Sequence, residues 1–96
     1  MRQFSDKGTA DIFEGIYSKD ARRTLPSTLH RRARMMLLVL TTAATINDLR
    51  IPASNRLERL EGARKGQHSI RINDRYRICF AWSVEGARKI EITDYH

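Results

Sequence analysis

The chain has 96 residues, a formal net charge of +7, a pI of about 10.3 and one cysteine, Cys79. This length predicts a single domain over residues 1–96, and one cysteine excludes an intramolecular disulfide and fits a reducing compartment. The charge predicts a polyanion or an acidic protein as partner, with a basic surface that serves only solubility as the alternative.

No stretch of the sequence indicates a membrane segment. The N-terminus lacks the apolar core of a secretory signal, and the longest aliphatic run, Met35 to Leu40, is too short to cross a bilayer. We therefore expect a cytoplasmic protein with no membrane partner.

The first part of the chain predicts a short strand followed by a short helix. Residues 2–4 form the expected strand, and Asp6 is a suitable N-cap for the helix. Gly15 lowers the helix propensity, so we expect the helix to be short. Its predicted apolar face consists of Ile12, Phe13, Ile16 and Tyr17. The charged residues 18–25 predict a loop.

The next segment predicts the longest helix. Pro26 suits its first turn, and residues 46–51 predict one further turn that ends before Pro52. The apolar stripe of the long helix consists of Leu29, Ala33, Met36, Leu37, Leu40 and Ala44. Arg31, Arg32 and Arg34 lie mostly off this stripe, which favours a solvated face over a binding surface. Residues 61–66, where two glycines flank a basic pair, predict a mobile basic loop before the sheet.

The last thirty residues alternate with period two and predict an antiparallel three-strand meander. Asn73-Asp74 and Glu85-Gly86 suit the two tight turns. The residues expected to face the helices are Ile70, Ile72, Tyr76, Ile78, Phe80, Trp82, Ile90 and Ile92. The residues expected on the opposite face are Arg71, Arg77, Cys79 and Glu91. The pattern predicts an α+β fold with N-terminal helices on one face of the sheet.

An arginine at the centre of a half-buried sheet face needs a partner, because burial of an unpaired charge is costly. Arg77 has Glu91 as a possible cross-strand partner, and it also has room for an external anion. Both possibilities stay open at the level of sequence.

The residues offer few other chemistries. The three histidines, His30, His68 and His96, have no short ligand spacing, and no glycine-rich phosphate loop or Ser-His-Asp signature is present. We therefore expect neither a metal nor another cofactor.

An acid/base arrangement on a basic surface suits RNA cleavage without a metal. This reaction needs a base for the 2′-OH proton, a cation for the phosphate and an acid for the leaving oxygen. Arg77, His96 and Tyr95 supply these residue types, and Asp94 is an acceptor at the end of the last strand. Further phosphate contacts could come from Arg64, Lys65, His68 and Arg71. A passive nucleic-acid or protein binder is the alternative that these residues leave open.

Four motifs resemble a known family. They are residues 55–62 (NRLERLEG), 66–73 (GQHSIRIN), 76–80 (YRICF) and the terminal Asp94-Tyr95-His96. They are similar to the HigB-type toxins of the RelE superfamily, the killer proteins of bacterial toxin–antitoxin modules. The resemblance covers the whole chain and is most specific from Asn55 onward, whereas the helical half matches mainly in layout.

The resemblance implies a RelE-like fold with helices on one side of a curved antiparallel sheet. It implies a ribosome-dependent mRNA endonuclease that acts in the ribosomal A site and inhibits translation. It also implies a HigA-like helix-turn-helix antitoxin as partner, through which operator DNA is bound only indirectly. By the resemblance, Arg77 stabilises the phosphate and the active-site tail is Asp94, Tyr95 and His96.

The sequence departs from the family at two positions. Some members carry a histidine and a lysine just before the sheet, where this chain has Glu58 and Glu61. An acid there repels phosphate, although Glu58 could instead act as the general base. A ParE-like inhibitor of DNA gyrase and a non-catalytic basic RNA-binding module are therefore the alternative functions.

Strict alternation along the last strand places His96 and Arg77 on opposite faces of the sheet. The predicted site consequently requires the chain to leave the sheet near Asp94 and to bring the histidine over the edge.

Overall fold

The computed structural model describes residues 3–51 and 53–94. Its helical elements are α1 (Lys7–Glu14), α2 (Lys19–Thr24), η1 (Ser27–Leu29), α3 (His30–Thr42), η2 (Ile46–Arg50), η3 (Ala53–Asn55) and η4 (Gly62–Arg64). Its strands are β1 (Glu58–Arg59), β2 (Gln67–Arg71), β3 (Tyr76–Ser83) and β4 (Gly86–Asp94). The structure confirms the predicted α+β class.

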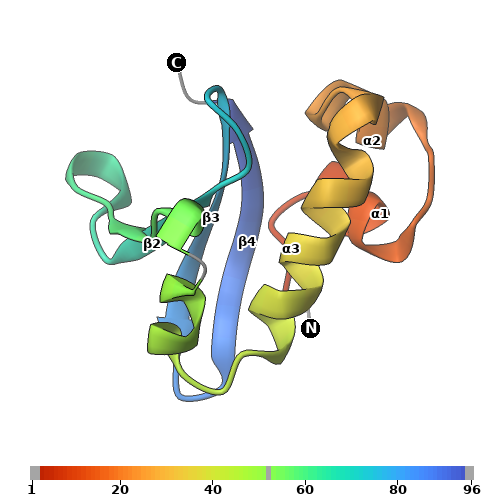
Figure 1. The fold of residues 1–96 in the computed structure, drawn as a ribbon. Coiled ribbons are helices and arrows are strands. Elements are labelled where there is room, and N and C mark those ends of the chain that lie inside the picture. Colours follow the sequence, from red (N-terminus) through yellow and green to blue (C-terminus); the bar gives the residue numbers. More distant parts are fainter. Residues whose placement is uncertain (1–2, 52, 95–96) are drawn as a thin grey trace.

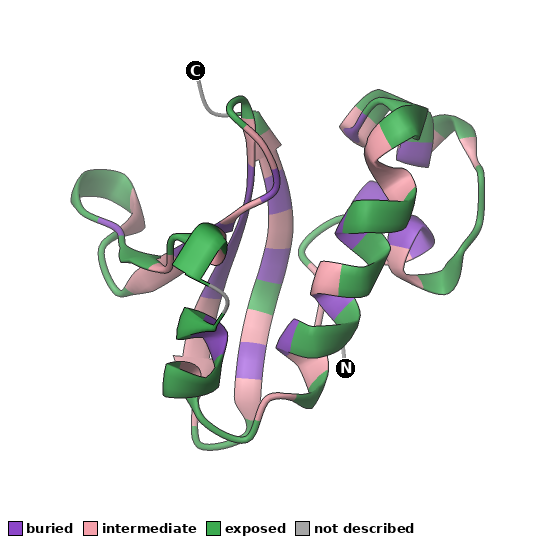
Figure 2. Ribbon diagram, viewed as in Figure 1, coloured by how far each residue is buried: buried purple, intermediate pink, exposed green. Residues whose placement is uncertain are grey.

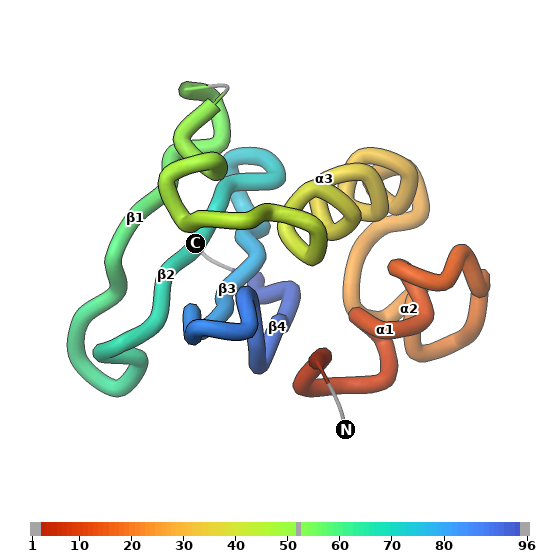
Figure 3. The backbone as a smooth tube through the Cα atoms, turned by 90° about the horizontal axis from the view of Figure 1, so that it is seen from below, coloured from red at the N-terminus to blue at the C-terminus, as the bar shows by residue number. Residues whose placement is uncertain are grey.

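The helices and the sheet form two layers (Figure 1). Seen from below, α3 and the segment with η2 and η3 run along the same side of the sheet (Figure 3). No helix in the described ranges 3–51 and 53–94 is long and apolar enough to span a bilayer.

The sheet is an antiparallel meander in the order β1-β2-β3-β4. The three predicted strands are confirmed as β2, β3 and β4, and β1 is an additional strand of two residues. The pairing of β3 with β4 shifts between Cys79 and Ala81, where Lys89 adopts a positive φ of 53°. This shift has the form of a β-bulge, which bends the edge strand.

The composition of the core confirms the side of the sheet that was predicted to face the helices. The core between the helices and the sheet contains Leu37 and Leu40 of α3, and from the strands Ile70, Ile78, Phe80, Ile90 and Ile92. Each of these side chains has a relative exposure of 7% or less. Figure 2 shows buried residues recurring along β4 and along α3, between residues that are more exposed. The faces of the sheet are therefore those that the sequence predicts, with one face available for a site.

In the N-terminal half, the structure differs from the sequence-based prediction at the end of α1 and at α2. Asp6 caps α1 as predicted, by accepting a hydrogen bond from the Thr9 amide. The helix ends at Gly15 in the left-handed region, so Ile16 and Tyr17 lie beyond it and are exposed, contrary to expectation. The loop predicted for residues 18–25 is also wrong, because α2 forms there behind an N-cap at Ser18.

Close contact between α1 and α2 requires a residue without a side chain. A Cβ on Gly8 would lie 1.8 Å from the Thr24 hydroxyl and 2.8 Å from the Asp20 carbonyl oxygen. Ala21 of α2 is fully buried. The two short helices therefore stabilise each other by packing, because helices of this length are not stable in isolation.

The outer edge of β4 is covered by the start of the chain. Phe4 forms a parallel bridge with Ile90, whose backbone also bonds to Gln3 and Ser5, and residue 2 of the strand predicted at residues 2–4 lies outside the described residues. The fully buried Thr9 hydroxyl accepts a hydrogen bond from the Ile92 amide over 3.1 Å. An exposed strand edge invites pairing with other chains, so this cover protects the sheet.

The long helix begins four residues after Pro26, behind the 3-10 turn η1. Ala33, Leu37 and Leu40 of the predicted stripe are fully buried, whereas Ala44 lies beyond the helix and is exposed. The further turn predicted at 46–51 is confirmed as η2, with a capping box between Thr45 and Asp48.

Candidate functional site

Arg77 lies at the centre of the sheet face opposite α3 and is only 8% exposed. Its Nε donates to the Ser69 hydroxyl over 2.7 Å, and its Nη2 donates to the Arg56 carbonyl over 2.7 Å. The same Nη2 lies 3.5 Å from the Glu58 carboxylate. The guanidinium is thus fixed in one plane before any ligand binds, which is the condition for strong bidentate recognition of a phosphate.

The carbonyl that accepts from Arg77 belongs to a residue with an unusual backbone. Arg56 has a positive φ of 48°, a conformation that costs a non-glycine residue roughly 1–3 kcal/mol. The position comes directly after η3 and just before β1. In this conformation the Arg56 carbonyl oxygen accepts from the Arg77 guanidinium, so a backbone group stabilises the cation.

One row of side chains crosses the sheet next to Arg77. The strand register aligns Glu58 with Ser69, Ser69 with Cys79 and Cys79 with Glu91. Ser69 and Cys79 are fully buried, whereas Glu58 and Glu91 at the two ends keep side-chain exposures of 58% and 37%. The face therefore has a buried polar centre between two accessible carboxylates.

The hypothesis that Glu91 pairs with Arg77 is wrong. Glu91 instead forms an ion pair of 3.1 Å with Arg64, which also donates to the Gln67 side chain over 3.1 Å. Gln67 is on β2 and Glu91 is on β4, so the Arg64 guanidinium reaches across β3. The segment 61–66, predicted to be a loop, is a 3-10 turn whose arginine is held by the sheet.

Two further basic residues belong to this region. Arg71 lies directly opposite Arg77 in the register of β2 and β3, and it pairs with Asp74. Lys65 follows η4 next to Arg64 and is exposed. We define the basic face as Arg64, Lys65, Arg71 and Arg77. The contacts and register of the three arginines place them on one side of the sheet, and Lys65 is the exposed neighbour of Arg64 in the chain.

His68 does not join the basic face. It lies opposite Phe80 in the register, and its ring stacks on Phe80 with centroids 5.9 Å apart, on the helix side of the sheet. Its Nδ1 is buried without a hydrogen-bond partner. Burial lowers the pKa of the imidazole below its usual value, and the charges of Arg59 and Arg50 lower it further. The structure places His68 against Phe80, away from Arg77, and its expected phosphate contact stays a prediction.

Asp94 also lies on the helix side. It is opposite Tyr76, which packs against the core, and its two carboxylate oxygens accept from Arg75 over 2.9 and 2.8 Å. This fork holds the end of β4 against the start of β3. Tyr95 and His96 lie outside the described residues, so their predicted place beside Arg77 stays a prediction.

The sequence patterns did not predict that the Ser69 hydroxyl and the Arg56 carbonyl accept hydrogen bonds from Arg77. Ser69 has the same parity as Arg71 on its strand, so the alternation alone puts it on the basic face. No local signal marks the Arg56 carbonyl, because its role depends on a contact across 21 positions of the chain.

The described residues provide no metal site. In ranges 3–51 and 53–94, no group of three or more His, Cys, Asp or Glu side chains is arranged to hold a metal ion. The expectation that the reaction needs no cofactor stays a prediction that the products of the reaction can test.

Comparison with known proteins agrees with this architecture. The family model for the RelE-like toxin HigB of type II toxin–antitoxin systems matches residues 2–96. Toxin HigB-1 of Vibrio cholerae is 40% identical over 95 residues, which cover 98% of this chain and 95% of the relative. An uncharacterised protein of Haemophilus influenzae is 35% identical over 63 residues, which cover 66% of this chain and 62% of that protein.

Proposed function

Since this chain belongs to the HigB family of RelE-like toxins of type II toxin–antitoxin systems, we propose that it cleaves mRNA on the ribosome and thereby arrests translation. The observation that carries this proposal is the fixed guanidinium of Arg77 at the centre of the basic face. A cation held in place before the reaction stabilises charge as it develops on the phosphate, without a reorganisation cost.

Arg77 is the phosphate clamp in this proposal. Its hydrogen bonds to Ser69 and to the Arg56 carbonyl set the orientation of its planar fork. Attack by the 2′-oxygen crowds negative charge onto the phosphate oxygens. The arginine favours this state over the ground state, which is what accelerates the chemical step.

In this proposal the Glu58 carboxylate and the His96 imidazole carry out the proton transfers. His96 and Tyr95 follow β4 directly, and they reach Arg77 only if the chain leaves the sheet after Asp94. Glu58 lies 3.5 Å from the guanidinium that holds the phosphate in this proposal, and its carboxylate takes the 2′-OH proton. In the proposed reaction His96 donates to the leaving 5′-oxygen, and Tyr95 stacks on a base.

The RNA strand is held by the remainder of the basic face. Arg64 contacts Glu91 at one end of the buried row, Arg71 lies opposite Arg77, and Lys65 follows Arg64 in the chain. Such contacts position a phosphate backbone without reading its sequence. We expect cleavage without a metal, because the 2′-oxygen supplies the nucleophile.

A type II system implies an antitoxin as partner of this toxin. We propose a HigA-like helix-turn-helix antitoxin, so that operator DNA is contacted only through that protein. The mRNA and the ribosomal A site complete the proposed set of partners.

A translation extract tests the proposed function. Purified protein is added to ribosomes translating a defined mRNA, and the new 5′ ends are mapped. We expect cleavage only in translated regions, at a rate that falls by about 100-fold or more in Arg77→Ala, as for other groups that stabilise transition-state charge. Arg23→Ala, an exposed arginine of α2, is the matched control and should cleave like the wild type.

The same preparation distinguishes the other functions. Inhibition of DNA gyrase supercoiling with intact mRNA would establish a ParE-like activity instead. Salt-dependent RNA binding without cleavage or growth arrest would establish a passive module. Full activity in a variant that combines Arg77→Ala with deletion of His96 would refute the proposed roles.

A further inference from the structure

The outer side of α3 carries an apolar surface that the fold leaves uncovered. Among the described residues, six of the seven large hydrophobic side chains that are exposed lie on α3 or beside it: Ile16, Tyr17, Met35, Leu38, Val39 and Ile51. Contiguous exposed apolar patches are uncommon on monomers and mark interaction sites. The nuclease proposal uses none of these residues.

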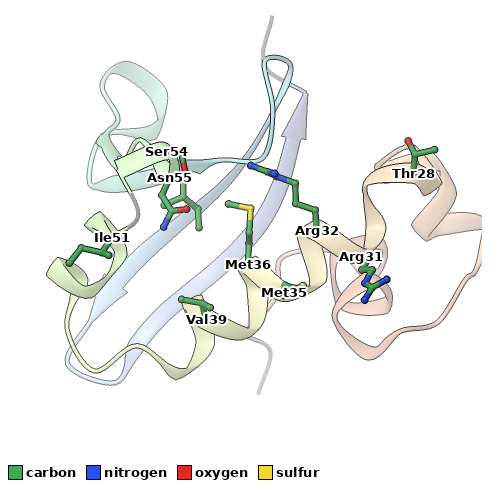
Figure 4. A pocket seen from close by; sticks show the side chains of 10 residues that line it. Thr28, Arg31, Arg32, Met35, Met36, Val39, Ile51, Ser54 and Asn55 are labelled. Atoms are coloured by element: carbon green, nitrogen blue, oxygen red, sulfur yellow. The ribbon is translucent and has the colours of Figure 1, made fainter.

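A groove of about 640 Å³ runs between α3 and the segment with η2 and η3. From α3 and the preceding turn it is lined by Thr28, Arg31, Arg32, Met35, Met36 and Val39, and from the other side by Ile51, Ser54 and Asn55 over Ile70. Arg32 and Met36 reach from α3 toward Ser54 and Asn55 (Figure 4). We call this the α3 groove.

Charge selects the kind of partner. The described lining of the α3 groove includes two arginines and no acidic residue. The ion pairs between described residues include neither Arg31 nor Arg32. Both arginines lie in the first turn of α3, where there is no acidic residue and no side-chain cap. Cations are unfavourable at a helix N-terminus, so an acidic partner would relieve this arrangement.

The composition of the groove favours a protein over a nucleic acid. Met35, Met36, Val39 and Ile51 contribute large apolar side chains to its lining, and methionine and arginine are enriched at protein interfaces. The surface suited to RNA is the basic face on the other side of the sheet. A two-fold contact between two copies of this chain, centred on the first turn of α3, would bring the arginines of both copies together and is disfavoured.

We propose that the α3 groove is the docking site for the antitoxin of this system and takes an amphipathic helix with an acidic end. The part of the lining on α3, from Arg31 to Val39, spans about 12 Å at 1.5 Å per residue, enough for roughly two turns of a partner helix. The partner's acidic residues meet Arg31 and Arg32, and its apolar residues at i, i+3, i+4 and i+7 cover Met35, Val39 and Ile51. This proposal rests on the family assignment and not on the nuclease activity.

Binding of the purified antitoxin by calorimetry tests the proposal. Met35→Glu with Val39→Glu places acids on two half-exposed positions of one helix face, four residues apart, so the fold should be kept. We expect the Kd for the antitoxin to rise about 100-fold or more, as for the loss of two central anchors. Arg31→Glu with Arg32→Glu should weaken binding about tenfold or more and reduce its salt dependence.

Matched controls separate the groove from general effects. Val84→Glu alters the remaining exposed hydrophobic, on the turn between β3 and β4, and Arg23→Glu alters an arginine of α2. Both should bind the antitoxin within about twofold of the wild type. Thermal unfolding and ribosome-dependent cleavage are measured on every variant, so a fold defect or a nuclease failure is distinguishable from a binding defect.

Hydrogen exchange provides a test without substitutions. Addition of the antitoxin should protect amides in residues 28–39 and 46–51, and less in β2 and β3. Unchanged antitoxin binding by both groove variants would overturn the proposal. So would loss of ribosome binding alone, which would identify the groove as an RNA contact, or a wild-type dimer that the groove variants dissociate.

Discussion

Replacing Ser69 by alanine separates the position of the Arg77 guanidinium from its charge. The change removes the hydroxyl that accepts from Arg77 Nε over 2.7 Å, at a site with 0% exposure. A buried donor left unsatisfied costs about 1–3 kcal/mol. In a domain of this size that lowers Tm by roughly 5–20 °C. If the same interaction orients the guanidinium toward the phosphate, 1–3 kcal/mol corresponds to a loss of about 5-fold to 150-fold in kcat.

The assay compares steady-state cleavage of ribosome-bound mRNA at 25 °C by the folded fractions of the wild type and the variants. Ser69→Ala should lower kcat with little change in KM, because the lost interaction acts mainly in the transition state. Ser69→Thr keeps the hydroxyl but adds a methyl group at a closely packed site. It should therefore lower Tm and yet keep kcat within about threefold of the wild type.

Ser83→Ala is the matched control, because Ser83 is a strand serine at the far end of β3. Its hydroxyl donates to the Gly86 carbonyl over 3.2 Å and has no contact with Arg77. Equal kcat in Ser69→Ala and in the wild type, with a lower Tm, would refute the positioning role and leave Ser69 a structural residue only.

Two further predictions concern stability. Gly8→Ala should destabilise the domain by about 1–3 kcal/mol, because the added methyl group meets Thr24 and the Asp20 carbonyl oxygen, and chemical denaturation measures this loss. His68→Phe, which keeps the ring contact with Phe80, should make the free energy of unfolding depend less on pH in the acidic range. The burial of His68 lowers its pKa, so the wild type is fully stabilised above the unfolded pKa near 6.5 and loses stability as pH falls from there toward the folded pKa.

Each of these has a control. Alanine at Gly66, where an added Cβ meets no atom within 4 Å, reports the cost of its positive φ of 95° alone. Stability of the Gly8 variant equal to that of the wild type would show that α1 and α2 shift apart without cost. A His68 imidazole that titrates near 6.5 in the folded protein, followed by NMR, would contradict the account of its burial.

The sheet was predictable from sequence because its faces differ in chemistry at every second residue. Alternation from Ile70 to Ile92 gave the strands, the turns and the membership of Arg77 and Arg71 on one face. The two-residue strand β1 was not predictable, since Glu58 and Arg59 are both exposed and carry no alternation. The same holds for α2, whose six residues bury only Ala21.

The contacts within the site join residues that are far apart in the sequence, so no local sequence pattern predicts them. The bulge near Lys89 sets the register that aligns Glu91 with Cys79, and Glu91 takes Arg64 as its partner. Alternation alone correctly puts His68 and Asp94 on the helix side. The residue type of His68 suggested a phosphate contact, which stays a prediction, whereas its place on the helix side follows from the register of its strand.

Cleavage of a defined ribosome complex tests the central claim most directly. A 5′-labelled mRNA is fixed with one codon in the A site, and binding and single-turnover cleavage are measured for the wild type and Arg77→Ala. We predict equal ribosome binding, a cleavage rate at least about 100-fold lower for the variant, and wild-type products that end in a 2′,3′-cyclic phosphate and a 5′-hydroxyl. Equal cleavage rates, or 5′-phosphate ends, would contradict the role of Arg77 as the clamp for attack by the 2′-oxygen.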